Sequence, residues 1–72
     1  MEREVKIRGE MIRLGQLLKL AGLIDAGGEA ASYLGSHRVR VNGEDEGRRG
    51  RQLHPGDAVA VGDTTIRIAA GG

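Results

Sequence analysis

Apolar and polar residues alternate at the start of the chain. Val5 and Ile7 are separated and followed by basic residues. This period of two predicts a short strand with one buried face. Residues 9–10, Gly-Glu, then predict a turn.

Apolar residues next recur with the spacing of a helix. They are Leu14, Leu17, Leu18 and Ala21. The pattern predicts an amphipathic helix over residues 14–21. Gly22 suits the left-handed position just beyond a helix end, and Leu23 supplies the apolar residue that often closes such a cap.

A second helix is predicted over residues 26–36, with Asp25 as its N-cap. Its apolar stripe would consist of Ala30, Ala31 and Leu34. Gly27 and Gly28 each lower helix propensity by about 1 kcal/mol relative to Ala, so they need another role. Either their bare N–H groups let an anion approach closely, or they let the two helices pack tightly.

The period changes from helical to two at Val39 and Val41. Asn42-Gly43 follows and predicts a tight hairpin turn, because both residues tolerate positive φ. Residues 53–57, Leu-His-Pro-Gly-Asp, predict a type II turn with Pro at its second and Gly at its third position.

Two further strands are predicted around Val59 and Val61 and around Ile66 and Ile68, joined by a turn at residues 62–63. The element order is then β-α-α-β-β-β-β. It predicts a single α+β domain over residues 1–72, in which a helix-turn-helix pair packs on a small, mainly antiparallel sheet.

Composition narrows the function classes. Tyr33 is the only aromatic residue, so the core must be aliphatic, with Tyr33 expected at its edge. The chain has no cysteine, which excludes disulfides and thiolate chemistry. His37 and His54 stand alone, and no nucleophile triad or phosphate-binding loop is present. We therefore expect a binding module rather than an enzyme, with no metal and no cofactor.

The apolar runs bear on location. None approaches the roughly 18 residues of a membrane span. The first ten residues carry charges where a signal peptide would be apolar. We expect a cytoplasmic protein with no membrane partner.

Net charge is only +1, but the basic residues are unevenly distributed. Five arginines fall within fourteen residues: Arg38, Arg40, Arg48, Arg49 and Arg51. Arginine grips phosphate through two hydrogen bonds, so a cluster of arginines favours nucleic acid. Alternatively, these arginines pair with the acidic residues 44–46 that lie between them.

The strings IRLGQLLKLAGLIDAGGEA and RVRVNGEDEGRRGRQLHPGDAVAV carry a resemblance. In order and spacing they resemble the RNA-binding domain named after ribosomal small-subunit protein S-four, the S4-like domain. The resemblance covers residues 12–61, and within this superfamily the chain is most similar to the small stand-alone bacterial members of the YaaA/YbcJ type. Where the broader family has a Ser-Arg pair opening the second helix, this chain has Ala26-Gly27.

The resemblance implies an RNA-binding surface made by the two helices and the adjoining hairpin. The basic positions that match the family pattern are Arg13, Lys19, Arg40, Arg48, Arg49 and Arg51. Arg38 joins them by position, and Gly27 and Gly28 are candidates through their N–H groups. With a single aromatic residue for stacking, recognition of structured RNA, such as ribosomal RNA, is expected over sequence reading of single strands. The oligomeric state stays open.

The C-terminal Gly71-Gly72 raises an alternative, because β-grasp sulfur carriers also end in two glycines. Their fold needs a two-stranded hairpin before the main helix, and only about thirteen residues precede the helix here. It also offers no place for the helix predicted over residues 26–36. The sequence therefore favours RNA binding over the carrier.

Overall fold

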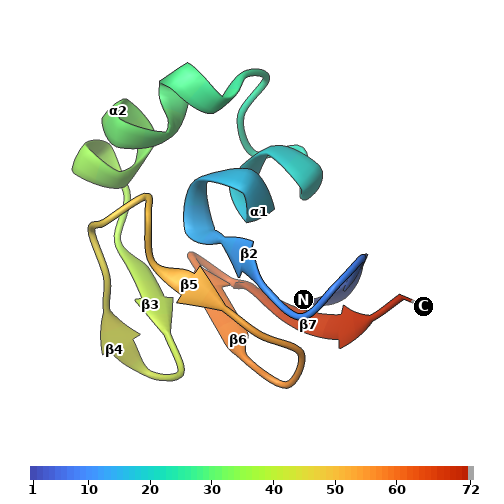
Figure 1. Ribbon diagram of the computed structural model, residues 1–72. Coiled ribbons are helices and arrows are strands. Elements are labelled where there is room, and N and C mark those ends of the chain that lie inside the picture. Colours follow the sequence, from blue (N-terminus) through green and yellow to red (C-terminus); the bar gives the residue numbers. More distant parts are fainter. Residues whose placement is uncertain (72) are drawn as a thin grey trace.

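The computed structural model describes residues 1–71, which form an α+β domain with two α-helices and a mixed five-stranded sheet (Figure 1). The helical elements are α1 (Leu14–Leu20), the 3₁₀ helix η1 (Gly27–Glu29) and α2 (Ala30–Ser36). The strands are β1 (Glu2–Ile7), β2 (Ile12–Arg13), β3 (Val39–Val41), β4 (Glu44–Asp45), β5 (Gln52–Leu53), β6 (Ala58–Val61) and β7 (Thr64–Ala70). The predicted fold class is thereby confirmed at this level. No helix within residues 1–71 is long and apolar enough to cross a membrane.

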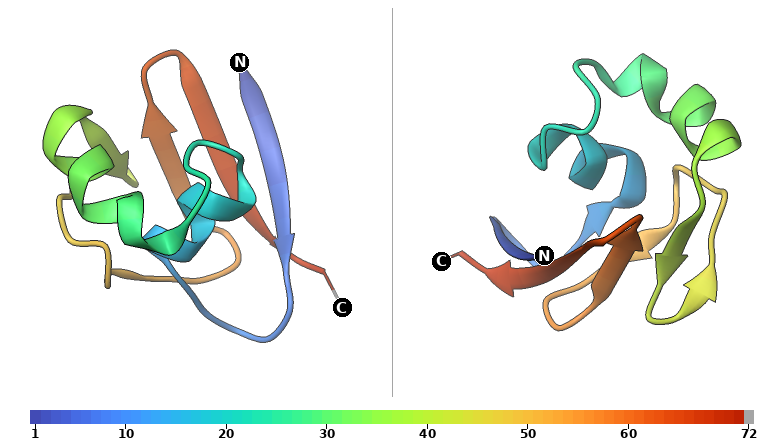
Figure 2. Two further views of the ribbon diagram at one scale, coloured as in Figure 1. Left: turned by 90° about the horizontal axis from the view of Figure 1, so that it is seen from above. Right: turned by 180° about the vertical axis from the view of Figure 1, so that it is seen from behind.

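The main sheet has the strand order β1-β7-β6-β3-β4. β1 runs parallel to β7, with Glu2 opposite Thr65 and Ile7 opposite Ala70, and the other three pairings are antiparallel. Figure 2 shows the blue first strand beside the red last strand. The first strand is therefore the edge strand of the sheet, and the last strand lies beside it.

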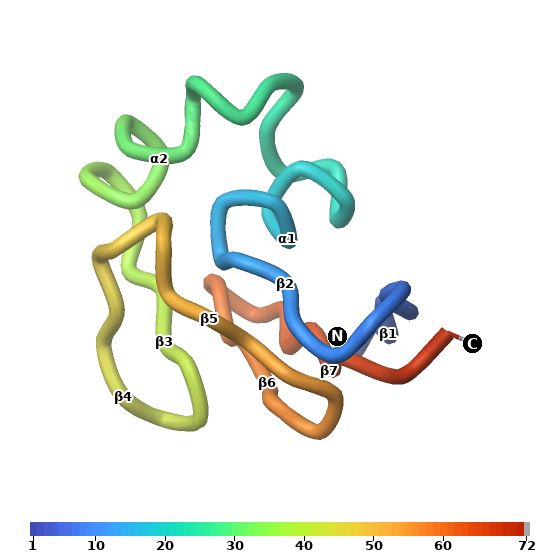
Figure 3. The backbone as a smooth tube through the Cα atoms, in the orientation of Figure 1, coloured from blue at the N-terminus to red at the C-terminus, as the bar shows by residue number. Residues whose placement is uncertain are grey.

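Two short strands form a second pairing that the sequence did not predict. β2 and β5 are antiparallel, with Ile12 opposite Leu53 and Arg13 opposite Gln52. This pairing joins the residues that precede α1 to those that follow residues 46–51, which we call the arginine-rich loop. It thereby brings that loop next to the start of α1 (Figure 3).

The helices cover one face of the sheet, and the core between them is aliphatic, as predicted (Figure 1). Its largest fully buried side chains are Leu14, Leu17, Leu18, Leu53, Ile66, Val41 and Val59. Tyr33 is half-buried and packs against the edge of this core, which confirms the prediction for it. Its ring also stacks on His37, with the ring centroids 4.0 Å apart.

The C-terminal cap of α1 forms as predicted. Gly22 adopts φ +78°, a conformation that glycine takes without strain. Its N–H donates to Lys19 O at 3.0 Å, and the Leu23 N–H donates to Leu18 O at 3.0 Å. These two bonds form a Schellman motif, which satisfies carbonyls at the helix end.

The second helix begins differently from the prediction. A 3₁₀ turn at Gly27–Glu29 comes first, and the α-helix starts only at Ala30. Asp25 is not the N-cap. Instead the Glu29 carboxylate turns back and accepts the N–H groups of Asp25 and Ala26, at 2.9 and 3.1 Å. Glycine's low helix propensity explains why the first turn winds irregularly.

The double glycine does not serve close helix packing. A Cβ added at Gly27 or Gly28 would meet no atom within 4 Å. The tight contact lies at Gly15 of α1, where a Cβ would come within 3.3 Å of the Ala30 Cβ and 3.5 Å of the Arg49 carbonyl oxygen. The close approach of α1, α2 and the arginine-rich loop therefore depends on Gly15.

The turns predicted at residues 42–43 and 53–57 are confirmed. Asn42 and Gly43 have φ of 52° and 86°, which is the backbone of a type I′ turn between β3 and β4. Gly56 has φ 100°, and the Asp57 N–H donates to His54 O at 3.0 Å, as a type II turn requires. These turns fix the connections from β3 to β4 and from β5 to β6.

Candidate nucleic-acid interface

Nearly half of the basic side chains are already paired with carboxylates. Arg38 and Arg40 contact Asp45, Arg48 and Arg51 contact Glu46, and Arg67 contacts Glu2. For four of the five clustered arginines, the predicted pairing with nearby acids is therefore present. The fifth, Arg49, makes no ion pair within residues 1–71.

The pairs at Asp45 are loose and exposed. Its Oδ1 lies 3.6 Å from Arg38 Nε and 3.4 Å from Arg40 Nε, and the three side chains are 48–70% exposed. Exposed ion pairs of this kind contribute at most about 1 kcal/mol to stability. The two arginines therefore lose little when they exchange Asp45 for another anion.

Glu46 is held much more tightly, with its side chain only 6% exposed. It accepts hydrogen bonds from the backbone N–H and the Nε of Arg48, at 3.1 and 3.0 Å, and from Arg51 Nη1 at 2.8 Å. The side chains of Arg48 and then Arg51 lower the pKa of Glu46 to about 2, although burial opposes this shift. The carboxylate is thus ionised throughout the neutral range.

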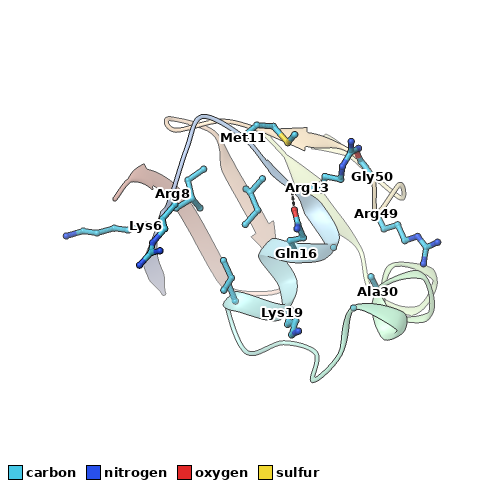
Figure 4. Close-up of a pocket in the computed structure, with 14 residues that line it drawn as sticks. Lys6, Arg8, Met11, Arg13, Gln16, Lys19, Ala30, Arg49 and Gly50 are labelled. Atoms are coloured by element: carbon cyan, nitrogen blue, oxygen red, sulfur yellow. Dashed lines mark hydrogen bonds between the residues drawn. The ribbon is translucent and has the colours of Figure 1, made fainter. Parts of the chain in front are cut away.

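Five of the six remaining Lys and Arg residues line one groove of about 880 Å³ beside α1 (Figure 4). Within residues 1–71, five cations that form no ion pair line it: Lys6, Arg8, Arg13, Lys19 and Arg49. No Asp or Glu side chain belongs to this lining. We call this surface the basic groove.

Several elements build the basic groove. Lys6 ends the polar side of β1, Arg13 lies on β2, and Lys19 lies on α1. Arg13 Nη1 donates to Gly50 O at 3.1 Å, and Gln16 Oε1 accepts the Arg13 backbone N–H at 3.1 Å. The bond to Gly50 joins one wall of the groove to the arginine-rich loop that carries Arg49.

The floor of the basic groove is apolar. Ile7 and Ile12 are buried there, whereas Met11 and Leu20 are 39% and 60% exposed. Met11 and Leu20 are two of the three large exposed hydrophobic side chains in residues 1–71. The groove therefore offers both cations and an apolar surface to one ligand.

The structure brings together some of the residues expected at the site and separates others. Those that line the basic groove are Arg13, Lys19, Gly27 and Arg49. Arg48 and Arg51 line a separate hollow with His54, and Arg38 lies in another beside β4. Arg40 lies on β3, paired with Asp45, and Gly28 is exposed outside the groove.

Lys6 and Arg8 line the groove but were not among the expected site residues, because their alternation with Val5 and Ile7 indicates only the polar side of a strand. The resemblance began at residue 12 and so left them out. Within the described residues, no cluster of three His, Asp or Glu side chains could hold a metal ion. The chemistry of the basic groove is that of an anion-binding surface.

The low pKa of Glu46 gives a testable pH dependence. Its folded pKa of about 2 lies below the usual 4.5, so ionised Glu46 stabilises the fold above about pH 4.5. That contribution is lost as pH falls from 4.5 towards 2. An NMR titration should show the Glu46 carboxyl titrating well below the usual glutamate pKa of 4.5. A Glu46 midpoint at or above 4.5 would contradict the ion-pair geometry.

Comparison with known proteins identifies the family. The model of the S4 domain matches residues 5–69. A protein of Bacillus subtilis (strain 168) named "Probable ribosome maturation protein RlbA" is 49% identical over 61 residues, which cover 85% of this chain and 86% of that protein. With its two helices, its mixed sheet and a match over nearly its whole length, the chain belongs to the S4 domain family.

Proposed function

We propose that the chain is a binding module without a reaction of its own, and that it binds structured RNA through the basic groove. The observation that carries the proposal is that five cations without carboxylate partners, among residues 1–71, line one surface. Phosphate contacts by Lys and Arg dominate affinity for nucleic acid. Cations that already hold carboxylates would have to exchange them first, so the basic groove supplies the main contacts.

The apolar floor suggests which part of the RNA enters. A regular RNA duplex presents phosphates and hydroxyl groups on its outside, whereas loops and bulges expose the faces of bases. Met11 and Leu20 offer apolar contact to such a base, and Arg13 and Arg49 can hold the flanking phosphates. We propose that the groove takes an unpaired nucleotide of a structured RNA.

The remaining expected site residues take a secondary place. Arg38 and Arg40 are exposed and loosely paired, so they can extend the phosphate contacts along β3. Gly27, which lines the groove, can offer its N–H there, and Gly28 lies at its margin. In this proposal α1, η1 and α2, which contact one another, form the helix-turn-helix pair of αL type.

The similar Bacillus subtilis protein is named as a probable ribosome maturation protein, which favours ribosomal RNA as the ligand. The sulfur-carrier alternative loses support, since the S4 domain family accounts for the second helix that a β-grasp fold lacks. The N–H of Gly71 also donates to Ile7 O at 2.9 Å, so Gly71 lies against β1. Gly72 lies outside the described residues.

Ultraviolet crosslinking in cells, followed by sequencing of the bound RNA, tests this proposal. We expect recovery of ribosomal RNA, with crosslinks at unpaired nucleotides and on peptides that contain Met11, Lys19 or Arg49. A chain with the C-terminal glycines deleted should crosslink equally. Recovery of no RNA above background, or crosslinks confined to residues outside the basic groove, would contradict it.

A further inference from the structure

Glu46 is an acidic residue next to a surface proposed to bind a polyanion, and the hydrogen bonds that it makes explain its place there. We propose that Glu46 is a positioning residue for RNA binding, which holds the arginine-rich loop so that Arg49 lies at the rim of the basic groove. The inference rests on the proposed function, and it assigns opposite roles to arginines that are adjacent in the sequence.

The first step is that Glu46 organises the loop from within. Its N–H donates to Val39 O at 2.8 Å, which ties it to β3. Its carboxylate binds the Arg48 backbone N–H, the Arg48 guanidinium and the Arg51 guanidinium. Glu46 is the one polar or charged residue buried within residues 1–71. These donors satisfy the buried carboxylate of Glu46. The guanidinium groups of Arg48 and Arg51 are therefore held against Glu46.

The second step is that the loop so held caps α1. Arg51 O accepts the Leu14 N–H at 2.9 Å, and Arg49 O accepts the Gly15 N–H at 2.9 Å. The first N–H groups of a helix have no partner within the helix, and here the loop backbone supplies the partners. The absence of a Cβ at Gly15 lets the Arg49 backbone come this close.

The third step is the outcome for the groove. The Arg48 and Arg51 side chains are occupied by Glu46, and the backbone of residue 49 is fixed on α1. Arg49 then lies at the rim of the basic groove beside Ala30, with its guanidinium directed outward (Figure 4). Glu46 thus acts on the RNA through Arg49 rather than by touching it.

The substitution Glu46→Gln tests this inference, because an effect of charge and an effect of positioning predict opposite changes in the affinity for RNA. If charge alone mattered, loss of a carboxylate would tighten binding to RNA. Positioning predicts a dissociation constant weakened roughly tenfold, as for Arg49→Gln, because both variants remove the same interaction with RNA and a charged hydrogen bond is worth about one such factor. The probe is a fragment of ribosomal RNA that binds the unchanged protein. Glu44→Gln, an exposed site on β4, is the matched control and should bind as tightly as the unchanged protein or slightly tighter.

A double-mutant cycle separates positioning from a general loss of stability. Glu46→Gln combined with Arg49→Gln should bind about as weakly as either variant alone, since both remove one interaction. The slope of log affinity against log salt should flatten by roughly 0.7–0.9, the value for one phosphate. Independent, multiplying effects of the two substitutions, or Glu46→Gln binding as tightly as Glu44→Gln, would overturn the inference.

A readout without RNA keeps this inference distinct from the proposed function. Amide hydrogen exchange at Leu14 and Gly15 should become several-fold faster in Glu46→Gln, because the loop that accepts their N–H groups opens more often. If the unchanged protein binds no RNA, the proposed function fails while this exchange result still stands. If Glu46→Gln does not fold, Arg51→Gln provides a second test, because it removes one of the two guanidinium partners of Glu46. Arg51→Gln combined with Arg49→Gln should then bind RNA about as weakly as either variant alone. Independent effects of these two substitutions on the dissociation constant would also overturn the inference.

Discussion

The double substitution Lys19→Gln with Arg49→Gln is expected to weaken binding to ribosomal RNA roughly 100-fold. Both side chains line the basic groove and form no ion pair within residues 1–71. A hydrogen bond to a charged group contributes about 1.5 kcal/mol at the lower end, so two such bonds amount to about 3 kcal/mol. That free energy corresponds to a factor of roughly 100 in the dissociation constant. Filter binding or fluorescence anisotropy would measure it.

The matched control for this result is Arg3→Gln with Arg67→Gln. It removes the same two positive charges, but neither residue lines the groove: Arg3 donates to Ala21 O and Arg67 pairs with Glu2. Its affinity should stay within about threefold of the unchanged protein, since exposed charges at a distance are screened by salt. Equal losses for the two double variants would mean that net charge, rather than the groove, determines affinity.

The substitution Leu53→Ala is expected to lower the free energy of unfolding by about 2–5 kcal/mol. Leu53 is fully buried, and loss of its side chain both removes apolar burial and leaves a cavity. A chain of 72 residues buries a small core, and small domains are only marginally stable. The substitution should lower the melting temperature by about 10 °C or more, at roughly 4–8 °C for each kcal/mol.

Leu20→Ala provides the control for Leu53→Ala, because it makes the same chemical change at a side chain that is 60% exposed. Its free energy of unfolding should change by less than about 1 kcal/mol. Urea unfolding monitored by circular dichroism would compare the two variants. If Leu53→Ala were as stable as Leu20→Ala, the side chain that β5 contributes to the core would not stabilise the fold.

Features that depend on neighbouring residues could be predicted from the sequence. The helix at residues 14–20 follows from apolar spacing, and its cap follows from Gly22. The turns at Asn42-Gly43 and Pro55-Gly56 follow from residues that tolerate positive φ or fix it. Each of these is a short-range preference that the rest of the fold does not override.

Features that depend on distant residues could not be predicted in this way. The parallel pairing of β1 with β7 joins the two ends of the described chain. The β2–β5 pairing involves only two residues in each strand, which is too short for a period-two pattern. The second helix was expected from residue 26 with Asp25 as its N-cap, but α2 begins at Ala30 after a 3₁₀ turn. The Glu29 carboxylate, rather than the Asp25 side chain, accepts the N–H groups of Asp25 and Ala26.

The same distinction applies to the site. The arginine cluster of residues 38–51 is plain in the sequence, but sequence cannot tell which guanidinium meets a carboxylate. Arg48 and Arg51 bind buried Glu46, whereas Arg49, between them, lines the basic groove. Lys6 lines that groove only because the fold places β1 beside the C-terminal end of α1, where Arg3 Nη1 donates to Ala21 O at 2.8 Å. The sequence therefore shows which basic residues are available, whereas the tertiary fold decides which of them line the groove.

The dependence of affinity on salt concentration tests the central claim most directly. Binding of a ribosomal RNA fragment should be measured at several salt concentrations for the unchanged protein, Lys19→Gln with Arg49→Gln, and Arg3→Gln with Arg67→Gln. The groove variant should have a slope of log affinity against log salt flatter by roughly 1.4–1.8, as the removal of two cations from RNA phosphates requires. The control should keep the slope of the unchanged protein. Parallel lines for the groove variant and the unchanged protein would show that the basic groove does not hold the RNA backbone.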